Sequence, residues 1–381
     1  MPAFVDYEFL RVVWWLLLGV LLAGFAVMDG FDLGTGIWLP FLGKTDSERR
    51  IIINTVGPVW EGNQVWLILG GGAIFAAWPP VYAVAFSGFY LAMFLVLCSL
   101  ILRPVGFKYR SKLEDPRWRT TWDWLLFVGG FVPALVFGVA VGNALLGVPF
   151  RFDSDLRMTY EGGLLGLFRP LALLTGLVSV AMLAMHGGAY LAAKAEEPVA
   201  SRARRAAALA AMTLIVLLIV GAVWTANGLA GYRIVGVLAH NLPSNPLHKQ
   251  VVRETGAWLA NYAAMPVLAL VPALAVGAAA FAIAALRAAR DSLAVFLTGV
   301  SVACVVATAG VSMFPFILPS DLVPAMSLTV WDASSSRSTL LLMLAATLLF
   351  MPIILVYTAF VYRVLRGRVT AKRVESDGHS Y

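Results

Sequence analysis

The sequence predicts an all-α, polytopic membrane protein. Hydrophobic residues make up 60% of the 381 residues and charged residues 13%, and the mean hydropathy is +0.84. Soluble domains are about 45–50% apolar and about 25% charged, so this composition excludes a soluble protein. Apolar runs recur along the whole chain and leave no room for a sizeable soluble domain. We therefore expect one integral membrane domain over residues 1–381.

Nine windows are long and apolar enough to cross a bilayer, for which a helix needs ~20 mostly apolar residues. The predicted spans are approximately 11–30, 58–77, 81–103, 122–146, 168–190, 207–228, 258–286, 292–316 and 339–362. The connecting segments 229–257 and 317–338 are long enough to fold over the bundle. Acidic residues rather than basic ones precede the first window, so we do not expect a cleavable signal peptide.

The positions of Lys and Arg predict the orientation, because cytoplasmic loops are enriched in them. If the loop after the third span is cytoplasmic, 20 of the 28 basic residues lie on the cytoplasmic side and 8 on the other. The eight are Arg11, Arg151, Arg157, Arg169, Arg233, Lys249, Arg253 and Arg337. We therefore expect an N-terminus outside and a cytoplasmic tail over 363–381. The net charge of +7 reflects these loops, and we expect no binding of nucleic acid.

Four acids, Asp29, Asp32, Glu61 and Asp123, fall within or at the ends of predicted spans. Ionisable side chains in a membrane are costly and by default mark a pathway or a site. The predicted topology places all four, and Arg103, near the cytoplasmic ends of their helices. Burial favours the protonated form of a carboxyl group and a neighbouring arginine opposes it, so a balanced group can pass protons. The sequence thus predicts a proton entrance that faces the cytoplasm.

The first two acids also have a structural interpretation. Asp29 and Asp32 are three residues apart and share one helical face. Gly30, Gly34 and Gly36 surround or follow them, and glycine commonly ends a helix. The pair could therefore mark a helix end at which the chain turns.

The other two acids have structural interpretations as well. Glu61 closely follows Pro58, a favoured first helical residue, and could simply complement the positive end of a helix dipole. Asp123 could be a structural partner of Arg103 or Arg119.

Histidines are too few for this chain to hold several haems. Haem iron takes axial ligands that are typically His, Met or Cys. Only His186 lies in a predicted span, whereas His240 and His248 lie in an outer segment and His379 in the tail. His186 is better explained as a polar residue satisfied at a helix interface. The motifs of soluble catalysts, H-E-x-x-H, G-x-S-x-G and the P-loop, are absent, so the chain alone is a poor candidate for a catalyst.

Distinctive motifs are spread along the sequence. They are MDGFDLGTG (28–36), TDSERRIIINTVGPVWEGNQVWLILGGGAIFAAWP (45–79), AFSGFYLAM (85–93), LRPVGFKYRSK (102–112), RWRTTWDW (117–124), SNPLHKQVVRETGAWL (244–259), MFPFILPS (313–320), SLTVWDASSS (327–336) and the C-terminal HSY. Together they resemble subunit II of the cytochrome bd-type quinol oxidases, most closely the ubiquinol-oxidising, proteobacterial kind. The resemblance is colinear over essentially the full length.

The resemblance implies a heterodimeric terminal oxidase of the bacterial inner membrane, with a periplasmic N-terminus in this chain. Subunit I of such an oxidase carries haems b558, b595 and d, oxidises ubiquinol and reduces oxygen to water with cytoplasmic protons, which is electrogenic without pumping. Subunit II forms two four-helix bundles plus a peripheral helix and lacks the haem ligands. The other implied partners are small single-span accessory subunits, membrane lipid and a structural quinone.

The resemblance also implies a role for Glu61. In the family, the acid after the first tryptophan of W-[DE]-GNQVW is proposed to line a proton path to the haem pair. Many relatives carry Asp there, so Glu61 keeps the charge and adds a methylene. Two other classes stay open: a secondary transporter with buried acids, although transporters usually show paired repeats, and a purely structural, non-conducting subunit.

Overall fold

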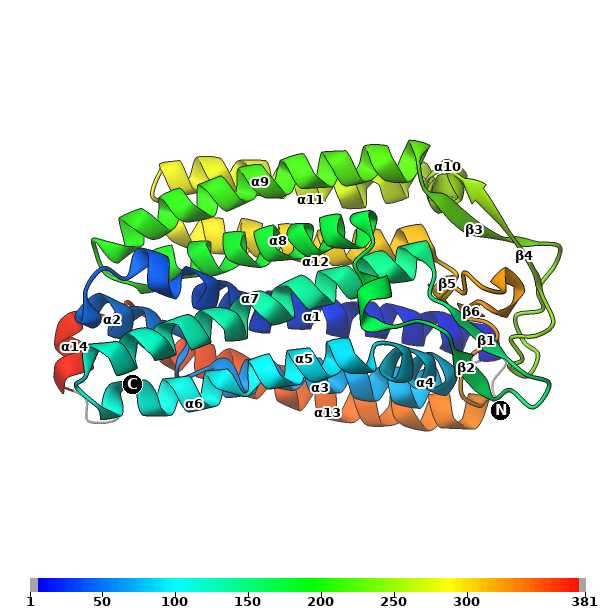
Figure 1. Cartoon of the computed structure of the whole chain (residues 1–381), viewed down its shortest axis with the longest axis horizontal. Coiled ribbons are helices and arrows are strands. Elements are labelled where there is room, and N and C mark those ends of the chain that lie inside the picture. Colours follow the sequence, from blue (N-terminus) through cyan, green and yellow to red (C-terminus); the bar gives the residue numbers. More distant parts are fainter. Residues whose placement is uncertain (1–5, 377–381) are drawn as a thin grey trace.

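The computed structural model describes residues 6–376 and consists mainly of helices that run along its longest axis (Figure 1). The helices are α1 (Tyr7–Leu42), α2 (Asp46–Val56), α3 (Trp60–Ala77), α4 (Pro79–Gly88), α5 (Tyr90–Leu100), α6 (Leu102–Tyr109), α7 (Pro116–Leu146), α8 (Pro170–Lys194), α9 (Val199–Asn227), α10 (Ala260–Ala264), α11 (Leu270–Arg287), α12 (Asp291–Met313), α13 (Arg337–Val364) and α14 (Ala371–Ser376). Helix α1 is central and contacts α3, α7, α8 and α12. It begins at one end of the molecule, and α2 and α14 lie at the other (Figure 1).

Eight helical segments within the described residues are long and apolar enough to cross a membrane, which confirms a helical, polytopic membrane protein. They are α1, Tyr90–Lys112, α7, α8, α9, Pro266–Arg287, α12 and α13. The predicted span 58–77 corresponds to α3, which has 18 residues and is not among the eight. Helix α3 is less apolar because Glu61, Asn63 and Gln64 lie in its first turns.

The predicted third and seventh spans differ most from the observed helices. The window 81–103 is divided among α4, α5 and α6, with interruptions at Phe89 and Ile101. Pro104 lacks the N–H that would bond to the carbonyl of Leu100, which weakens the helix there. The window 258–286 is interrupted before Pro266, because a proline disfavours helical backbone at the residue that precedes it. A 3-10 turn over Pro266–Ala269 leads into α11, and the two form one apolar segment, Pro266–Arg287.

Helix α1 is continuous for 36 residues, so the interpretation of Asp29 and Asp32 as a helix end is wrong. The glycines beside them serve close packing instead. A Cβ at Gly34 would lie 2.0 Å from the carbonyl oxygen of Leu183 and 2.9 Å from Cα of Gly187. Small residues allow helix backbones to approach closely in membrane proteins, and here they bring α8 against α1.

Three small antiparallel sheets depart from the prediction of a purely helical chain. They pair β1 (Phe150–Phe152) with β2 (Met158–Tyr160), β3 (Ala230–Val235) with β4 (Gln250–Thr255), and β5 (Phe316–Leu318) with β6 (Leu328–Thr329). All lie at the end of the molecule where α1 begins (Figure 1). One sheet lies in the predicted long segment 229–257 and another largely in 317–338, and the third lies in the connection between α7 and α8.

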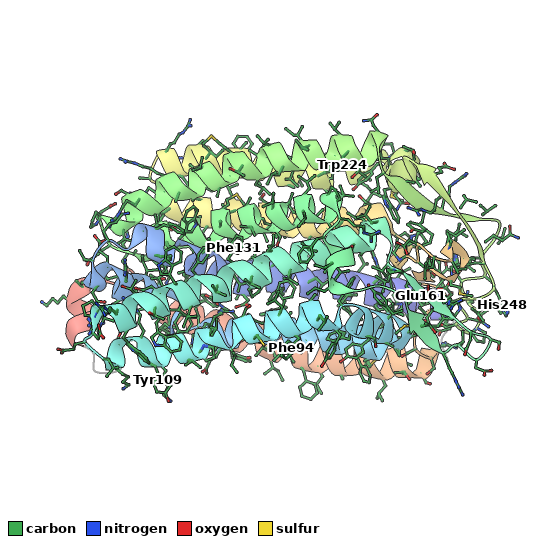
Figure 2. All side chains as sticks on the ribbon, in the orientation of Figure 1. Phe94, Tyr109, Phe131, Glu161, Trp224 and His248 are labelled. Carbon is green, nitrogen blue, oxygen red and sulfur yellow. The ribbon has the colours of Figure 1, made fainter. Side chains whose placement is uncertain are left out.

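Large apolar side chains cover the outside of the bundle. Phe94 and Trp224 project from it (Figure 2) and are exposed, and in α13 Leu340 is the one fully buried residue. Extensive exposed apolar surface is typical of contact with a membrane or with another protein. The predicted tail 363–381 includes α14, whereas His379 lies outside the described residues.

Candidate functional site

Two acids and one arginine form a buried ion cluster in the bundle. Helix α1 supplies Asp29 and Asp32 on one face, and α6 supplies Arg103. The guanidinium donates from Nη2 to Asp29 Oδ1 at 2.8 Å and from Nη1 to Asp29 Oδ2 at 3.1 Å. Asp32 Oδ2 lies 3.8 Å from Nη2. The acid side chains are fully buried and that of Arg103 is 3% exposed.

The charges of the buried ion cluster do not balance. Two carboxyl groups face one guanidinium, so the cluster has one positive charge too few unless a carboxyl binds a proton. Two carboxylates that share a dry site disfavour simultaneous ionisation. The arrangement can therefore hold and release a proton within the hydrophobic part of the bundle.

Two further polar residues hold Asp32 in place. Asn63 of α3 donates from Nδ2 to Asp32 Oδ2 at 2.9 Å, and Tyr362 of α13 donates from its hydroxyl to Asn63 Oδ1 at 2.7 Å. Sequence reasoning missed both residues. Asn63 is a polar residue within a predicted span, which is a usable signal, whereas Tyr362 resembles an ordinary interfacial tyrosine. The neutral amide carries no titratable proton, so Asn63 positions Asp32.

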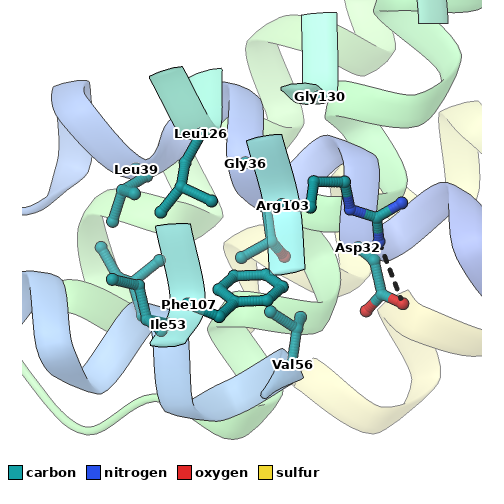
Figure 3. Close-up of a pocket in the computed structure, with 11 residues that line it drawn as sticks. Asp32, Gly36, Leu39, Ile53, Val56, Arg103, Phe107, Leu126 and Gly130 are labelled. Atoms are coloured by element: carbon teal, nitrogen blue, oxygen red, sulfur yellow. Dashed lines mark ion pairs between the residues drawn. The ribbon is translucent and has the colours of Figure 1, made fainter. Parts of the chain in front are cut away.

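A small pocket adjoins the buried ion cluster (Figure 3). Its volume is about 10 Å³, and its walls come from α1, α2, α6 and α7. Asp32 and Arg103 lie on one side, and Leu39, Ile53 and Leu126 lie on the other (Figure 3).

Asp123 belongs to a separate group, which we name the surface ion cluster because Asp46 opens it to the surface, although Arg110 and Asp123 are themselves buried. Its members are Asp46, Arg49, Arg110, Arg119 and Asp123. Arg110 donates to Asp123 Oδ1 at 2.6 Å from Nε and to Oδ2 at 3.2 Å from Nη2, and Arg49 Nη1 donates to Oδ2 at 2.8 Å. Asp46 accepts from Arg110 at 2.9 Å and from Arg119 at 2.7 Å. The expectation that Arg103 or Arg119 would pair with Asp123 is therefore wrong. Span hydropathy does not identify the residues of α2 as partners of Asp123, because α2 (Asp46–Val56) precedes the second predicted span.

Glu61 lies apart from both clusters. It stands in the first turn of α3, which begins at Trp60, and its side chain is exposed. Within residues 6–376 this side chain makes no hydrogen bond or ion pair. The expected gathering of four acids is thus reduced to Asp29 and Asp32 with Arg103.

His186 does not fit the role of a haem ligand. Its Nδ1 lies 2.8 Å from Thr298 Oγ1 and its Nε2 lies 3.1 Å from the carbonyl oxygen of Val27. Both ring nitrogens are therefore engaged in hydrogen bonds, and the ring is buried. Among the described residues, no group of three or more His, Cys, Asp or Glu side chains is arranged to hold a metal ion.

The fold and the buried ion cluster define a class: a polytopic helical membrane protein with charged groups held inside its bundle. Comparison with known proteins is more specific. The sequence matches the family model of cytochrome bd terminal oxidase subunit II over residues 10–365. The chain belongs to this family.

Named relatives extend over almost the whole chain. Cytochrome bd-I ubiquinol oxidase subunit 2 of Escherichia coli is 50% identical over 99% of both chains. A probable cytochrome oxidase subunit 2 of Haemophilus influenzae is 49% identical over 99% of both, and cytochrome bd ubiquinol oxidase subunit 2 of Bacillus subtilis is 31% identical over 95% of this chain and 98% of its own. A chain of the bd oxidase of Geobacillus thermodenitrificans has the same fold, with a TM-score of 0.64 over 93% of this chain and 98% of that chain at 15% identity.

The chain is accordingly a subunit of a membrane-bound oxidoreductase and a multi-pass protein of the bacterial inner membrane. The family assignment gives no support to the alternative of a secondary transporter.

Proposed function

We propose that this chain pairs with a haem-bearing subunit I in a ubiquinol:oxygen oxidoreductase and provides a path for cytoplasmic protons. The names of the relatives support the reaction. The observation that carries the proton path is the buried ion cluster, in which Asp29 and Asp32 face one arginine. Replacing a buried ion pair with well-packed apolar side chains often leaves stability unchanged or raises it, so stability alone does not account for these buried charges.

The haems b558, b595 and d belong, in this proposal, to subunit I. His186 supports this assignment, because both of its ring nitrogens are in hydrogen bonds and neither is free to ligate a haem iron. The large exposed apolar surface, including almost all of α13, suits subunit I, small single-span accessory subunits, lipid and a structural quinone.

Purification of the complex through a tag on this chain tests the pairing. Haem b and haem d absorption bands should co-purify with the tagged chain at a fixed ratio. Co-purification of no haem, or a full complement of haem on this chain expressed and purified alone, would contradict the proposal.

We further propose nine membrane crossings, with a periplasmic N-terminus and a cytoplasmic C-terminus. Helix α3 would be the ninth crossing beside the eight apolar segments. The positions of α1 and α14 support an odd number, because α1 begins at the end opposite to α14 (Figure 1). Reporter fusions after Arg119 and after Arg368 should both report cytoplasm; a periplasmic result at either position would refute this topology.

The proposed path begins at the surface ion cluster, whose Asp46 is 39% exposed, and continues to Asp32 and Asp29. Glu61 is assigned to the side of the path that meets subunit I. An exposed carboxylate at the start of a membrane helix is costly beside lipid, and contact with a polar partner would relieve that cost.

The variant Glu61→Gln separates this role from a structural one. If Glu61 only complements the helix dipole, the change should cost up to about 1 kcal/mol of stability and leave turnover unchanged. If it carries protons, turnover should fall severalfold with normal assembly and haem content, and Glu61→Asp should keep much of the activity. Normal turnover in Glu61→Gln would favour a structural role for this residue.

A further inference from the structure

Two polar atoms beside the pocket have no hydrogen-bond partner among the described residues: Asp32 Oδ1 and Thr35 Oγ1. Both residues line the pocket and both are buried, with 3% and 2% of their surface exposed. They are three residues apart on α1 and therefore share one face of the helix. The other carboxylate oxygen, Asp32 Oδ2, already accepts from Asn63. Buried polar atoms are nearly always paired with protein or with ordered water, so this pair needs a ligand.

The size and charge of the pocket determine which ligand fits. A volume of about 10 Å³ corresponds to the room that one water molecule occupies. Arg103 also lines the pocket and disfavours a cation, while the carboxylate of Asp32 disfavours an anion. A neutral water molecule can donate to the carboxylate and exchange a hydrogen bond with the hydroxyl. We propose that the pocket binds one water molecule that bridges Asp32 Oδ1 and Thr35 Oγ1.

The position of this water relative to the two ion clusters gives it a function. Phe107 lines the pocket and lies between Arg103 of the buried ion cluster and Arg110 of the surface ion cluster in the sequence. It follows Arg103 by four residues, about 6 Å along a helix axis, and precedes Arg110 by three residues, about 4.5 Å. Leu126 lines the pocket three residues after Asp123. The pocket therefore lies in an apolar layer between the buried ion cluster and the surface ion cluster.

The water extends the reach of Asp32 into that apolar layer. This step rests on the proposed proton path. Asp32 Oδ1 takes one proton from the water, and a solvent proton that enters at the exposed Asp46 of the surface ion cluster replaces it, so that one proton moves and the water is regenerated. Thr35 does not titrate; its hydroxyl positions the water.

The variant Thr35→Val tests the role of the hydroxyl, because valine keeps the branched shape and removes the oxygen. In the purified oxidase complex, turnover should fall about fivefold, the change that corresponds to one lost neutral hydrogen bond, and the solvent deuterium isotope effect should rise. Thr35→Ser should restore both values. The matched control is Thr213→Val on the exposed side of α9, which should change neither.

A high-resolution structure of the wild-type complex tests the water directly. Density for a water should lie within hydrogen-bond distance of Asp32 Oδ1 and Thr35 Oγ1 and should be lost in Thr35→Val. An empty pocket in maps that resolve other buried waters would refute the site. Wild-type turnover in Thr35→Val, together with impaired turnover in Asp32→Asn, would refute the role of the water and leave the proton path standing. Wild-type turnover in Asp32→Asn would instead refute the proposed path.

Discussion

Removal of the guanidinium from the buried ion cluster should destabilise the protein far more than removal of the same group at the surface. Arg103→Met keeps much of the side-chain length but eliminates two hydrogen bonds of 2.8 and 3.1 Å to Asp29. It also leaves two fully buried carboxyl groups without a counter-charge. Loss of one partner of a buried ion pair costs about 3–5 kcal/mol. The bidentate geometry places Arg103→Met in this range.

A surface ion pair supplies the matched control. Arg151 and Glu161 are 2.9 Å apart, with side chains that are 57% and 43% exposed, and such pairs contribute about 0–1 kcal/mol. Denaturation of the purified complex in detergent, followed by tryptophan fluorescence, would compare Arg151→Met with Arg103→Met. A loss in Arg103→Met no larger than that in Arg151→Met would refute the interpretation of the buried ion cluster as a coupled, desolvated unit.

Two further predictions concern packing and pH. Gly34→Ala should destabilise by about 1–3 kcal/mol, because its Cβ would lie 2.0 Å from the backbone oxygen of Leu183. Gly19→Ala in the same helix has nothing within 4 Å and should be neutral or slightly stabilising; equal losses in the two variants would contradict the close packing of α1 and α8. Burial raises the pKa of Glu48, but the ion pair with Arg202 at 2.6 Å and hydrogen bonds from the backbone N–H groups of Lys44 and Thr45 outweigh it and lower the pKa below its ordinary 4.5. A carboxyl group whose pKa is lower in the folded state stabilises the fold at pH values above its pKa in the unfolded chain, and this contribution is lost as the pH falls through its pKa in the folded state. Glu48→Gln should therefore cost about 0.5–1 kcal/mol of stability at neutral pH. That difference from wild type should disappear on acidification below pH 4.5, and a difference independent of pH would exclude a role for the charge.

The membrane class and the existence of most spans could be predicted because they depend on composition and on segment length. The ends of the helices could not, because they depend on contacts between distant segments. Gly34 illustrates the difficulty: a glycine signals either a helix end or a close approach, and only the position of Leu183 on α8 distinguishes the two. The interruptions before Pro266 and near Pro104 follow local rules and were within reach of sequence reasoning.

The candidate site shows the same limit. Depth along a helix follows from residue number, and it is the basis of the prediction that the acids lie near the cytoplasmic ends of their helices. Rotation about the helix axis decides the partners, and it depends on packing. Glu61 and Asn63 are two residues apart on α3, yet the first is exposed and the second is buried against Asp32. Asp123 pairs with Arg49 because the short helix α2 lies beside it. The hydropathy of the predicted spans does not indicate this arrangement.

Proton uptake by the oxidase with Asp32→Asn tests the central claim most directly. The change keeps the size of the side chain and removes the group that binds the proton. In vesicles that contain the fully haem-loaded complex, quinol oxidation and proton uptake from the cytoplasmic side should fall together by about tenfold or more. A loss of this size does not exceed the rate enhancement that a positioned acid or base typically supplies. Asp321→Asn, at an acid paired with Arg169 at 3.2 Å outside both clusters, should retain wild-type rates. Wild-type turnover and proton uptake in Asp32→Asn would contradict a proton path through the buried ion cluster.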